Sequence, residues 1–330
     1  MSYKKFILAP TRALAGGVGT YTIDFLLAFS DFRGISGDNL DSLNNNASLF
    51  VNVSGFNSRP TIKMYRNLYK FFSKNTAETI IYQGTLSLLV LPLLKLMWPS
   101  ASHIIIFHGL ASKYTSFPVG LVEKFAAAIA DVNVFLTKRD LILIGKESNS
   151  VVISNYAPNY INNLASFDSN NITTVTRLSK QKNLAFNLAE FQSLDLFVLD
   201  IYGVGTNKID LINYQNVTLA NHANHEEMYS DKFAFCLSTY SEGFPLSILE
   251  ASSFGLPLIL SDLPELREIC GDNALYFENN RVGSLASIVT NLKSDRGKHR
   301  EYSAKAIAVA KFYSREKWCE NLTQLLKDTS

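Results

Sequence analysis

The stretch Ser238–Ala251, with the sequence STYSEGFPLSILEA, decides the fold and the site of this chain. It places two glutamates, Glu242 and Glu250, eight positions apart, and a glycine and a proline follow the first of them. The apolar run at 233–237 is typical of a buried strand, and Pro245 suits a helix start because its missing N–H would be unpaired there anyway. The sequence therefore predicts a strand, a turn that carries Glu242 and a helix that carries Glu250. Such turns in α/β sheets bind ligands with anionic or hydroxyl-rich groups.

Length and composition indicate a folded protein of two domains. The chain has 330 residues, 47% of them hydrophobic and 18% charged, which is typical of globular proteins and not of disordered ones. Its three cysteines form neither a close pair nor a metal-binding spacing, and the first ten residues hold too short an apolar run for a signal peptide. We therefore expect a cytoplasmic protein. The apolar stretch 86–98 is too short to cross a membrane and is expected to form a buried helix.

Short apolar runs alternate with helical patterns along the whole chain, which predicts parallel sheets wrapped by helices. Residues 156–171 are rich in Asn, Ser and Pro and are expected to form a linker between two doubly wound domains that face a cleft. The tail at 302–326 has helical spacing. The strands are expected at 5–9, 48–53, 79–82, 103–107, 132–137 and 151–154 in the first half, and at 172–176, 196–202, 217–219, 233–237, 258–260 and 274–277 in the second.

The phrase from Glu242 to Asp262, which ends in GLPLILSD, resembles the Glu-x7-Glu signature of the retaining glycosyltransferases of family 4. That family has the two-domain GT-B fold. The resemblance implies an acceptor-binding Rossmann-like domain at 1–160, a donor-binding one at 161–315, and a C-terminal helix at 316–330 that returns to the first domain. Taken without the rest of the phrase, the two glutamates would fit an ordinary helix with one exposed and one capping carboxylate.

The resemblance also implies roles for individual residues of this turn and helix. Glu250 would accept hydrogen bonds from the ribose hydroxyls of a nucleotide, and Glu242 would position the donor sugar. The donor-binding residues would also include Gly243, Phe244 and Leu246.

Two cations follow the first expected strand of the second half, in the segment RLSKQKN at 177–183. Arg177 and Lys182 match cations of the family that bind the donor diphosphate. When a glycosidic bond to a diphosphate breaks, negative charge grows on the leaving group, and fixed cations stabilise it more in the transition state than in the ground state. The competing interpretation is a basic cluster at a solvated strand end.

Glycines follow the first expected strand of each half. In the sequence GGVG at 16–19, Gly17 and Gly19 open a helix whose start offers N–H groups to phosphate. A nicotinamide-binding pattern would also need a third small residue where Thr22 stands, and it matches poorly. The family places this loop near the donor phosphate and, through Gly16, on the acceptor side, and it places Gly203 near the nucleotide base.

Histidines offer further candidates. His108 ends an apolar strand and resembles the histidine that approaches the donor sugar in the family, although a lone histidine at a strand end is more often structural. His222, His225 and Glu226 are too few for a zinc site, and we expect no metal ligands among them.

Together these patterns predict a retaining, metal-independent glycosyltransferase that needs no cofactor. Its donor would be a nucleotide diphosphate sugar and its acceptor a glycan or a lipid-linked oligosaccharide, in the assembly of bacterial surface polysaccharide such as lipopolysaccharide or capsule. No nucleic-acid partner is expected. A catalytically inactive GT-B nucleotide-sugar-binding module and a GT-B sugar-nucleotide epimerase are the alternatives.

A basic helix is expected at 60–74, in the half of the chain that carries the positive charge. Residues 1–160 hold 15 Lys and Arg against 9 Asp and Glu, a net charge of +6, whereas residues 161–330 hold 16 against 20, a net charge of −4. Basic and aromatic faces together suit an anionic membrane surface, and an ordinary surface helix packed on the first sheet is the alternative. The basic face would hold Lys63, Arg66, Lys70 and Lys74, and the apolar face Ile62, Tyr65, Tyr69 and Phe72.

Overall fold

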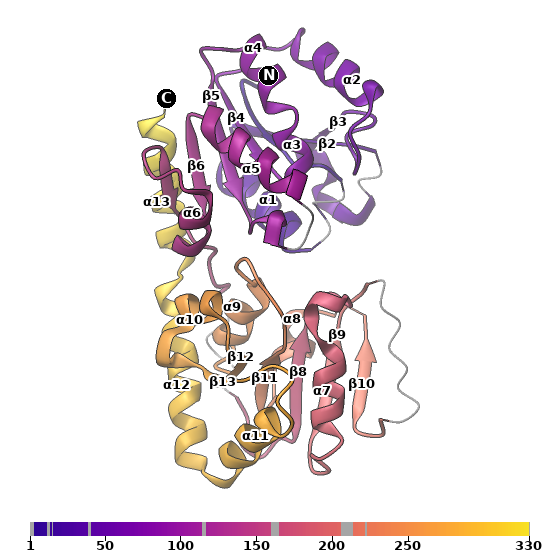
Figure 1. The fold of residues 1–330 in the computed structure, drawn as a ribbon, viewed down its shortest axis with the longest axis vertical. Helices are drawn as coiled ribbons and strands as arrows, with labels where there is room; N and C mark the ends of the chain where they lie inside the picture. The colour runs from indigo at the N-terminus through magenta and orange to yellow at the C-terminus, as the bar shows by residue number, and fades with distance from the viewer. Residues whose placement is uncertain are drawn as a thin grey trace. The chain divides into compact units, whose positions relative to one another are not determined.

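The computed structural model describes residues 3–11, 14, 16–38, 41–113, 117–159, 165–205, 214–221 and 223–329. The chain divides into two compact units, Met1–Ser154 with Cys319–Ser330, and Asn155–Trp318. Each unit contains one parallel β-sheet with helices packed against it (Figure 1). The predicted α/β fold with two doubly wound sheets is confirmed.

Within the described residues, the first sheet has seven strands in the order β3-β2-β1-β4-β5-β6-β7, all parallel. The strands are β1 (Lys5–Leu8), β2 (Phe32–Ser36), β3 (Phe50–Asn52), β4 (Thr79–Gln83), β5 (Ser102–Phe107), β6 (Val132–Phe135) and β7 (Ser150–Val152). The helices of this unit are α1 (Gly17–Ala28), α2 (Ile62–Phe72), α3 (Thr85–Leu88), α4 (Leu91–Met97), α5 (Phe117–Ile129) and α6 (Lys138–Ile144), with 3-10 helices at Asp41–Leu49 and Ala111–Lys113.

Two elements of the first unit differ from the prediction. Strand β2 was not expected, because Gly34 interrupts its apolar pattern; in the structure a Cβ at Gly34 would lie 2.4 Å from Cδ1 of Phe50, so the glycine makes room for that ring. The single helix expected over 86–98 is wrong. The segment forms α3 and α4 instead, and Pro92 lies in the first turn of α4, where its missing N–H leaves no carbonyl unpaired.

The second sheet has six strands within the described residues, in the order β10-β9-β8-β11-β12-β13, again all parallel. The strands are β8 (Asn171–Val175), β9 (Val198–Tyr202), β10 (Val217–Ala220), β11 (Ala234–Leu237), β12 (Leu258–Ser261) and β13 (Leu275–Phe277). The helices are α7 (Leu184–Phe191), α8 (His225–Tyr229), α9 (Leu246–Ser253), α10 (Pro264–Cys270), α11 (Ser284–Ser294) and α12 (Arg296–Phe312), with 3-10 helices at Lys180–Lys182 and Gly271–Asn273. The tail expected as one helix is split, since α13 begins anew at Arg315 and runs to Asp328.

Both sheets use the same chain path. Numbered from its own first strand, the second sheet reads 3-2-1-4-5-6 and the first reads 3-2-1-4-5-6-7, so in each the order reverses between the first and fourth strands. Parallel α/β sheets bind ligands outside the carboxyl ends of their strands at such a reversal. This places the candidate positions after β1 and β4 in the first unit and after β8 and β11 in the second.

Each unit has its own apolar core beneath these edges. Strands such as Ile104–Ile106 are buried without alternation, because helices cover both faces of a parallel sheet. Phe6, Leu8 and Ile105 belong to the core of the first unit, and Phe191 and Phe233 to that of the second. Among the helices that the structure describes, none combines the length and the apolar character that a membrane crossing requires.

Candidate active site

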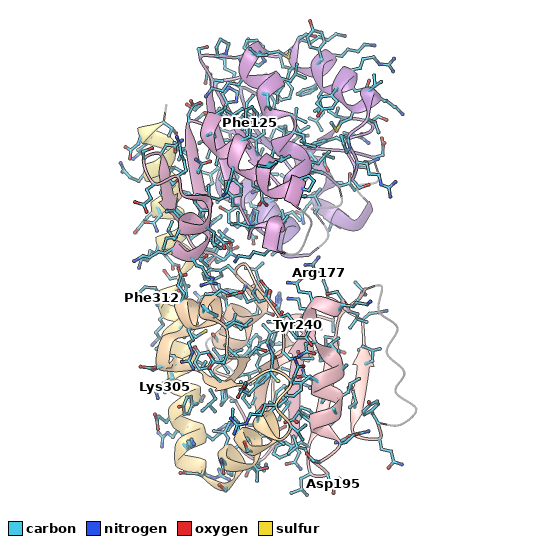
Figure 2. The ribbon with its side chains drawn as sticks, viewed as in Figure 1. Phe125, Arg177, Asp195, Tyr240, Lys305 and Phe312 are labelled. Atoms are coloured by element: carbon cyan, nitrogen blue, oxygen red, sulfur yellow. The ribbon has the colours of Figure 1, made fainter. Side chains whose placement is uncertain are left out.

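The loops after β8 and β11 build the candidate site of the second unit. Arg177 follows β8, and the segment 238–245 joins β11 to α9. Figure 2 shows Arg177 and Tyr240 at one end of this unit and Asp195, which precedes β9, at the other. Pro245, predicted as the first residue of the helix, is instead its N-cap with an extended backbone (φ −71°, ψ 117°), and α9 begins one position later, at Leu246.

A buried ion pair joins two of the predicted site residues. Lys182 Nζ lies 2.5 Å from Glu242 Oε1, and the two side chains are only 9% and 7% exposed. The sequence assigned both residues to the site but did not predict their contact. Removing one partner of a buried pair leaves the other charge uncompensated, which typically costs 3–5 kcal/mol. The pair therefore fixes the positions of both side chains.

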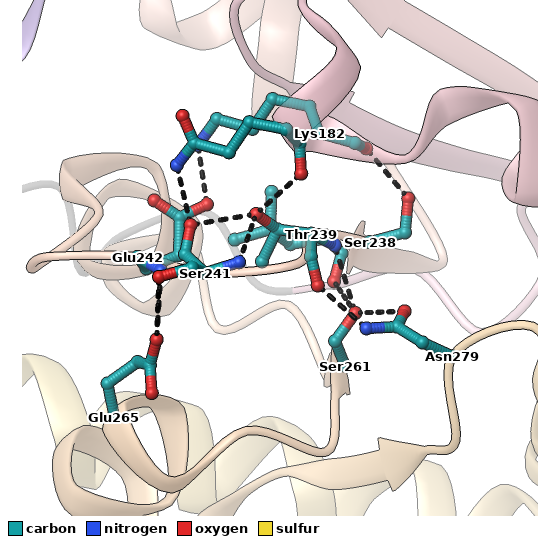
Figure 3. A network of polar contacts seen from close by, with 10 residues as sticks. Lys182, Ser238, Thr239, Ser241, Glu242, Ser261, Glu265 and Asn279 are labelled. Carbon is teal, nitrogen blue, oxygen red and sulfur yellow. Dashed lines mark hydrogen bonds and ion pairs between the residues drawn. The ribbon is translucent and has the colours of Figure 1, made fainter. Parts of the chain in front are cut away.

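The Glu242 loop is fastened by a network of polar contacts (Figure 3). The Thr239 N–H donates to Ser261 Oγ at 2.9 Å, and Asn279 Nδ2 donates to the Thr239 carbonyl at 2.8 Å. Gln181 Nε2 donates to the Ser241 carbonyl at 2.6 Å, which ties the Lys182 segment to the same loop. These contacts come from three different strand ends, so the loop has a defined position before any ligand binds.

Glu265 is a site residue that the sequence reasoning missed. It is buried in the first turn of α10, and its Oε1 accepts hydrogen bonds from the Glu242 N–H at 3.1 Å and the Ser241 hydroxyl at 3.2 Å. The signal available in the sequence was the acid directly after Pro264, at a helix start that follows a strand. Glu265 thus orients the backbone of the residue that carries the predicted sugar-positioning carboxylate.

Glu250 lies inside α9, as predicted, and is held by two residues of α8. Tyr229 donates its hydroxyl to Glu250 Oε2 at 2.6 Å, and His225 Nε2 lies 3.5 Å from Glu250 Oε1. The hydrogen bond from His225 to the carboxylate raises the pKa of the imidazole. The sequence identified Glu250 but gave no indication of Tyr229.

Arg177 is exposed and forms no ion pair with any residue that the structure describes, in contrast to Lys182. The backbone on either side of Arg177 packs closely against the segment that follows β9. A Cβ at Gly203 would lie 1.8 Å from the Thr176 carbonyl oxygen, and one at Gly205 would lie 2.2 Å from that of Leu178. Gly203, predicted to lie near a nucleotide base, is therefore also required for the close approach of two loops that positions Arg177.

The remaining donor-side predictions fall on the turn before α9. Gly243 and Leu246 are half-buried, whereas Phe244 is buried. The Phe244 ring packs edge-on against Tyr313 with centroids 5.2 Å apart, and its carbonyl accepts a hydrogen bond from Asn155 Nδ2 at 3.1 Å. The side chain of Phe244 thus anchors the turn.

In the first unit, the glycine loop leads from β1 into α1 as predicted. Gly16 caps the helix with φ 93°, a conformation that favours glycine, and Gly17 is the first helical residue. Gly19 donates its N–H to the Gly16 carbonyl at 2.9 Å, and a Cβ there would lie 1.9 Å from the Leu14 carbonyl oxygen. Gly19 is therefore explained by the fold of the loop itself.

His108 follows β5 at the same edge of the first sheet. The residue is half-buried, its ring meets Tyr21 edge-on at 4.7 Å, and its Nε2 is shielded from solvent without a hydrogen-bond partner among the described residues. Burial lowers the pKa of this imidazole to about 3, so the ring is neutral at physiological pH.

The histidines considered as metal ligands in the sequence lie at or near α8. His222 lies outside the described residues, and His225 is turned toward Glu250. Among the residues described, no group of three or more His, Cys, Asp or Glu side chains is arranged to hold a metal ion.

The basic helix exists as α2, with one correction. Lys63, Arg66 and Lys70 are exposed on it, and Lys74 is exposed just beyond its end. The predicted apolar face was wrong in part: Phe72 is fully buried in the core, together with Met64 and Leu68, and Tyr65 is half-buried with its hydroxyl on the Leu89 carbonyl. Only Ile62 (89% exposed) and Tyr69 (52% exposed) remain beside the basic residues. The residues of α2 that face the sheet, spaced three and four positions apart, are therefore buried in the core.

These two sheets and their edges define a protein with the GT-B fold of glycosyltransferases. HepE of Anabaena, solved with UDP and glucose, superposes with a TM-score of 0.82 at 14% identity, over 98% of this chain and 100% of that one. Sucrose-phosphate synthase of Thermosynechococcus elongatus gives 0.81 at 15% identity, over 98% of each chain. At such identities the likeness shows the fold.

Sequence comparison adds a family match for the second unit. Residues 159–309 match the family model described as glycosyl transferases group 1. The poly(glycerol-phosphate) alpha-glucosyltransferase of Bacillus subtilis (strain 168) is 29% identical over 162 residues, which are 44% of this chain and 24% of that protein. The O-antigen chain mannosyltransferase B of Escherichia coli is 32% identical over 89 residues, 27% of this chain and 23% of that protein. The chain thus spans about a quarter of the length of these two relatives.

Proposed function

We propose that this protein is a retaining glycosyltransferase of family 4. It transfers a sugar from a nucleotide diphosphate sugar to a glycan or lipid-linked acceptor during the assembly of bacterial surface polysaccharide. The observation that carries the proposal is the buried Lys182–Glu242 pair beside the exposed Arg177, at the strand-order reversal of the second sheet. The family match over 159–309 and the names of the relatives support the same activity.

The cations account for the chemistry of the leaving group. Arg177 and Lys182 stabilise the charge that develops on the diphosphate as the glycosidic bond breaks, a role that needs no metal ion. Glu242 holds the Lys182 side chain in place until the donor arrives. Because a diphosphate is a stronger competitor for the ammonium than one carboxylate, Lys182 then turns its charge toward the leaving group and Glu242 is released to position the sugar.

Other residues supply binding and orientation. Glu250 accepts hydrogen bonds from the ribose, while Glu265 and the Thr239–Ser261 contact keep the Glu242 turn in register. His108, a neutral imidazole with a shielded and unpartnered Nε2, has the chemistry to bond a sugar hydroxyl. The leaving phosphate oxygen takes the acceptor proton on the same face from which the acceptor attacks, so the anomeric configuration is retained.

A donor panel tests the activity. The protein is incubated with UDP-, GDP- and dTDP-sugars, and the donor that raises the melting temperature most is then supplied with lipid-linked and free glycan acceptors. We expect one donor class to stabilise the protein and to give a product with the donor's anomeric configuration by NMR. An inverted product would contradict the retaining mechanism, isomerised donor without acceptor would indicate an epimerase, and binding without turnover would indicate an inactive module.

We further propose that the protein is cytoplasmic and associates with the inner face of the plasma membrane through α2. Lys63, Arg66, Lys70 and Lys74 are exposed beside Ile62 and Tyr69. Each lysine near an anionic leaflet contributes about 1 kcal/mol, and this contribution falls with salt. We expect flotation with phosphatidylserine vesicles at low salt, and loss of flotation when the four basic residues become Glu. Absence of flotation by the unmodified protein would refute this part.

A further inference from the structure

Helix α8 packs against Glu250 in a way that fixes both oxygens of its carboxylate. Tyr229 donates its hydroxyl to Oε2 at 2.6 Å, a distance typical of a charge-assisted hydrogen bond. His225 Nε2 lies 3.5 Å from Oε1. The two rings lie nearly parallel, with centroids 6.2 Å apart and an interplanar angle of 15°, so they approach the carboxylate from one side.

Tyr229 is built into the core as a rigid support. It is fully buried, and its ring packs against Phe254 at the end of α9 and Phe235 of β11, with centroids 5.5 and 6.2 Å away. Burial raises the pKa of the phenol well above its ordinary value, so the hydroxyl remains a donor throughout the physiological range. A residue packed this closely cannot follow a moving carboxylate, and Glu250 must therefore adopt the orientation that Tyr229 sets.

The Glu250 side chain remains 18% exposed, so it is partly accessible to a ligand. A carboxylate has about four lone-pair directions. Tyr229 takes one of these directions on Oε2 and His225 faces Oε1, so both oxygens keep lone pairs for a ligand. This arrangement matches two neighbouring hydroxyl donors, such as the vicinal 2′- and 3′-hydroxyls of a ribose.

We propose that Tyr229 is a positioning residue that orients Glu250 to bind the ribose diol of the donor nucleotide, with His225 as a secondary support. The inference rests on the proposed function, because it assigns the nucleotide to Glu250. It adds that α8 determines the preference of the site for ribonucleotides over deoxyribonucleotides. A site built to bond a hydroxyl rejects an analogue that lacks it, and the rejection weakens when the acceptor is no longer held in place.

The test measures by calorimetry the affinities of the full chain for UDP, GDP and their 2′-deoxy forms. Tyr229→Phe removes only the hydroxyl, and Tyr276→Phe is the matched control, since it removes another hydroxyl of this unit, bonded to the Gly271 carbonyl at 2.7 Å. We expect Tyr229→Phe to lower the ratio of ribonucleotide to deoxyribonucleotide affinity about tenfold, with little change for the control. In turnover assays, the KM for the donor should rise while kcat changes little.

A purely structural Tyr229 would weaken both nucleotides equally and leave the ratio unchanged, which would overturn the inference. If Tyr229→Phe fails to fold, His225→Gln carries the test at a half-exposed position, where we expect the ratio to fall about threefold; an unchanged ratio there would overturn the inference as well. If the unmodified protein binds neither UDP nor GDP, the proposed function fails first. The two failures are therefore distinguishable.

Discussion

The two units share one strand order but differ at the edge where that order reverses. In the second unit the loops after β8 and β11 are fastened by the Lys182–Glu242 pair and by hydrogen bonds from Ser261, Asn279 and Glu265. In the first unit the corresponding edge is a glycine loop and His108, whose Nε2 has no partner among the described residues.

This comparison shows which properties of a ligand site the shared strand order does not determine. A parallel sheet determines where a ligand site lies, whereas the polar residues that follow its strands determine whether the site is formed before the ligand binds. The second edge is preorganised, which suits the stabilisation of a developing charge. The first edge is held by different contacts, such as the buried Lys113–Asp140 ion pair and the Thr22–Gln83 hydrogen bond, and it leaves His108 Nε2 without a hydrogen-bond partner among the described residues.

Replacing Lys182 by Ala is expected to have the largest effect on the stability and activity of the second edge. The substitution leaves Glu242 buried without its partner, so the free energy of unfolding should fall by about 3–5 kcal/mol, and turnover should fall more than the donor KM rises. Chemical denaturation and steady-state kinetics measure the two effects.

The double variant Lys182→Ala with Glu242→Gln is the control, because it removes both charges. It should recover most of the stability while remaining inactive. If the double variant were as unstable as the single one, the buried pair would not be what fastens this edge.

Arg177→Ala should separate catalysis from stability. Arg177 is exposed and without an ion pair among the described residues, so the melting temperature should barely change. The kcat should nevertheless fall about 10²–10³-fold, the usual effect of removing one group that stabilises transition-state charge. A rise in KM alone would show that Arg177 only anchors the ground state.

Gly203→Ala tests whether the close approach of two loops positions Arg177. A Cβ would lie 1.8 Å from the Thr176 carbonyl oxygen, so the loops must separate, at a cost of about 1–3 kcal/mol in unfolding free energy. Activity should fall further than this loss of stability explains. Gly297→Ala, in the exposed first turn of α12, is the control: a Cβ there would lie 3.2 Å from Asp295 Oδ1, a contact far less close than at Gly203, and activity should be unchanged.

The pH dependence of stability should have opposite signs at the two edges. An unfolded imidazole takes up its proton near pH 6.5, but folded His108 does so only at about 3. His108 therefore lowers the free energy of unfolding as the pH falls from 6.5 toward 3, because the unfolded state binds the proton more readily. His108→Asn should raise the free energy of unfolding at pH 5 by on the order of 1–2 kcal/mol.

His225 behaves in the opposite way, because Glu250 raises its pKa. The stability that this interaction contributes is complete below pH 6.5 and is lost as the pH rises through the raised pKa of His225. Since the side chain is half-exposed, His225→Asn should cost no more than about 0.5 kcal/mol, and only at acidic pH. Denaturation of both variants at pH 5 and 8 checks the signs, and equal signs would contradict the assigned environments.

The sequence was most informative where one short phrase carried both fold and chemistry. Alternating apolar runs predicted twelve of the strands, and β2 was missed because Gly34 serves the Phe50 ring, a contact distant in sequence. The faces of α2 were partly misassigned because periodicity locates a face, while only the packed sheet decides that Phe72 lies inside.

For the site, the residue types were predictable and their partners were not. Glu242, Glu250 and Lys182 stand in a recognisable pattern, but the contact of Lys182 with Glu242 joins residues sixty positions apart. Tyr229 and Glu265 act through single hydrogen bonds to those residues and leave no periodic signal in the chain. Such supporting residues become visible only when the strand ends are brought together.

The central claim is that the edge of the second unit binds a nucleoside diphosphate through Glu250, and calorimetry tests it most directly. Titration of the unmodified protein with UDP, GDP and dTDP should show saturable binding of UDP or GDP at a single site, and weaker binding of dTDP, which lacks the 2′-hydroxyl. Glu250→Ala should weaken that binding by about 1.5–3 kcal/mol, since hydroxyl groups would lose a charged acceptor. Binding that is unchanged by Glu250→Ala, or no binding of any of the three nucleotides, would contradict the account.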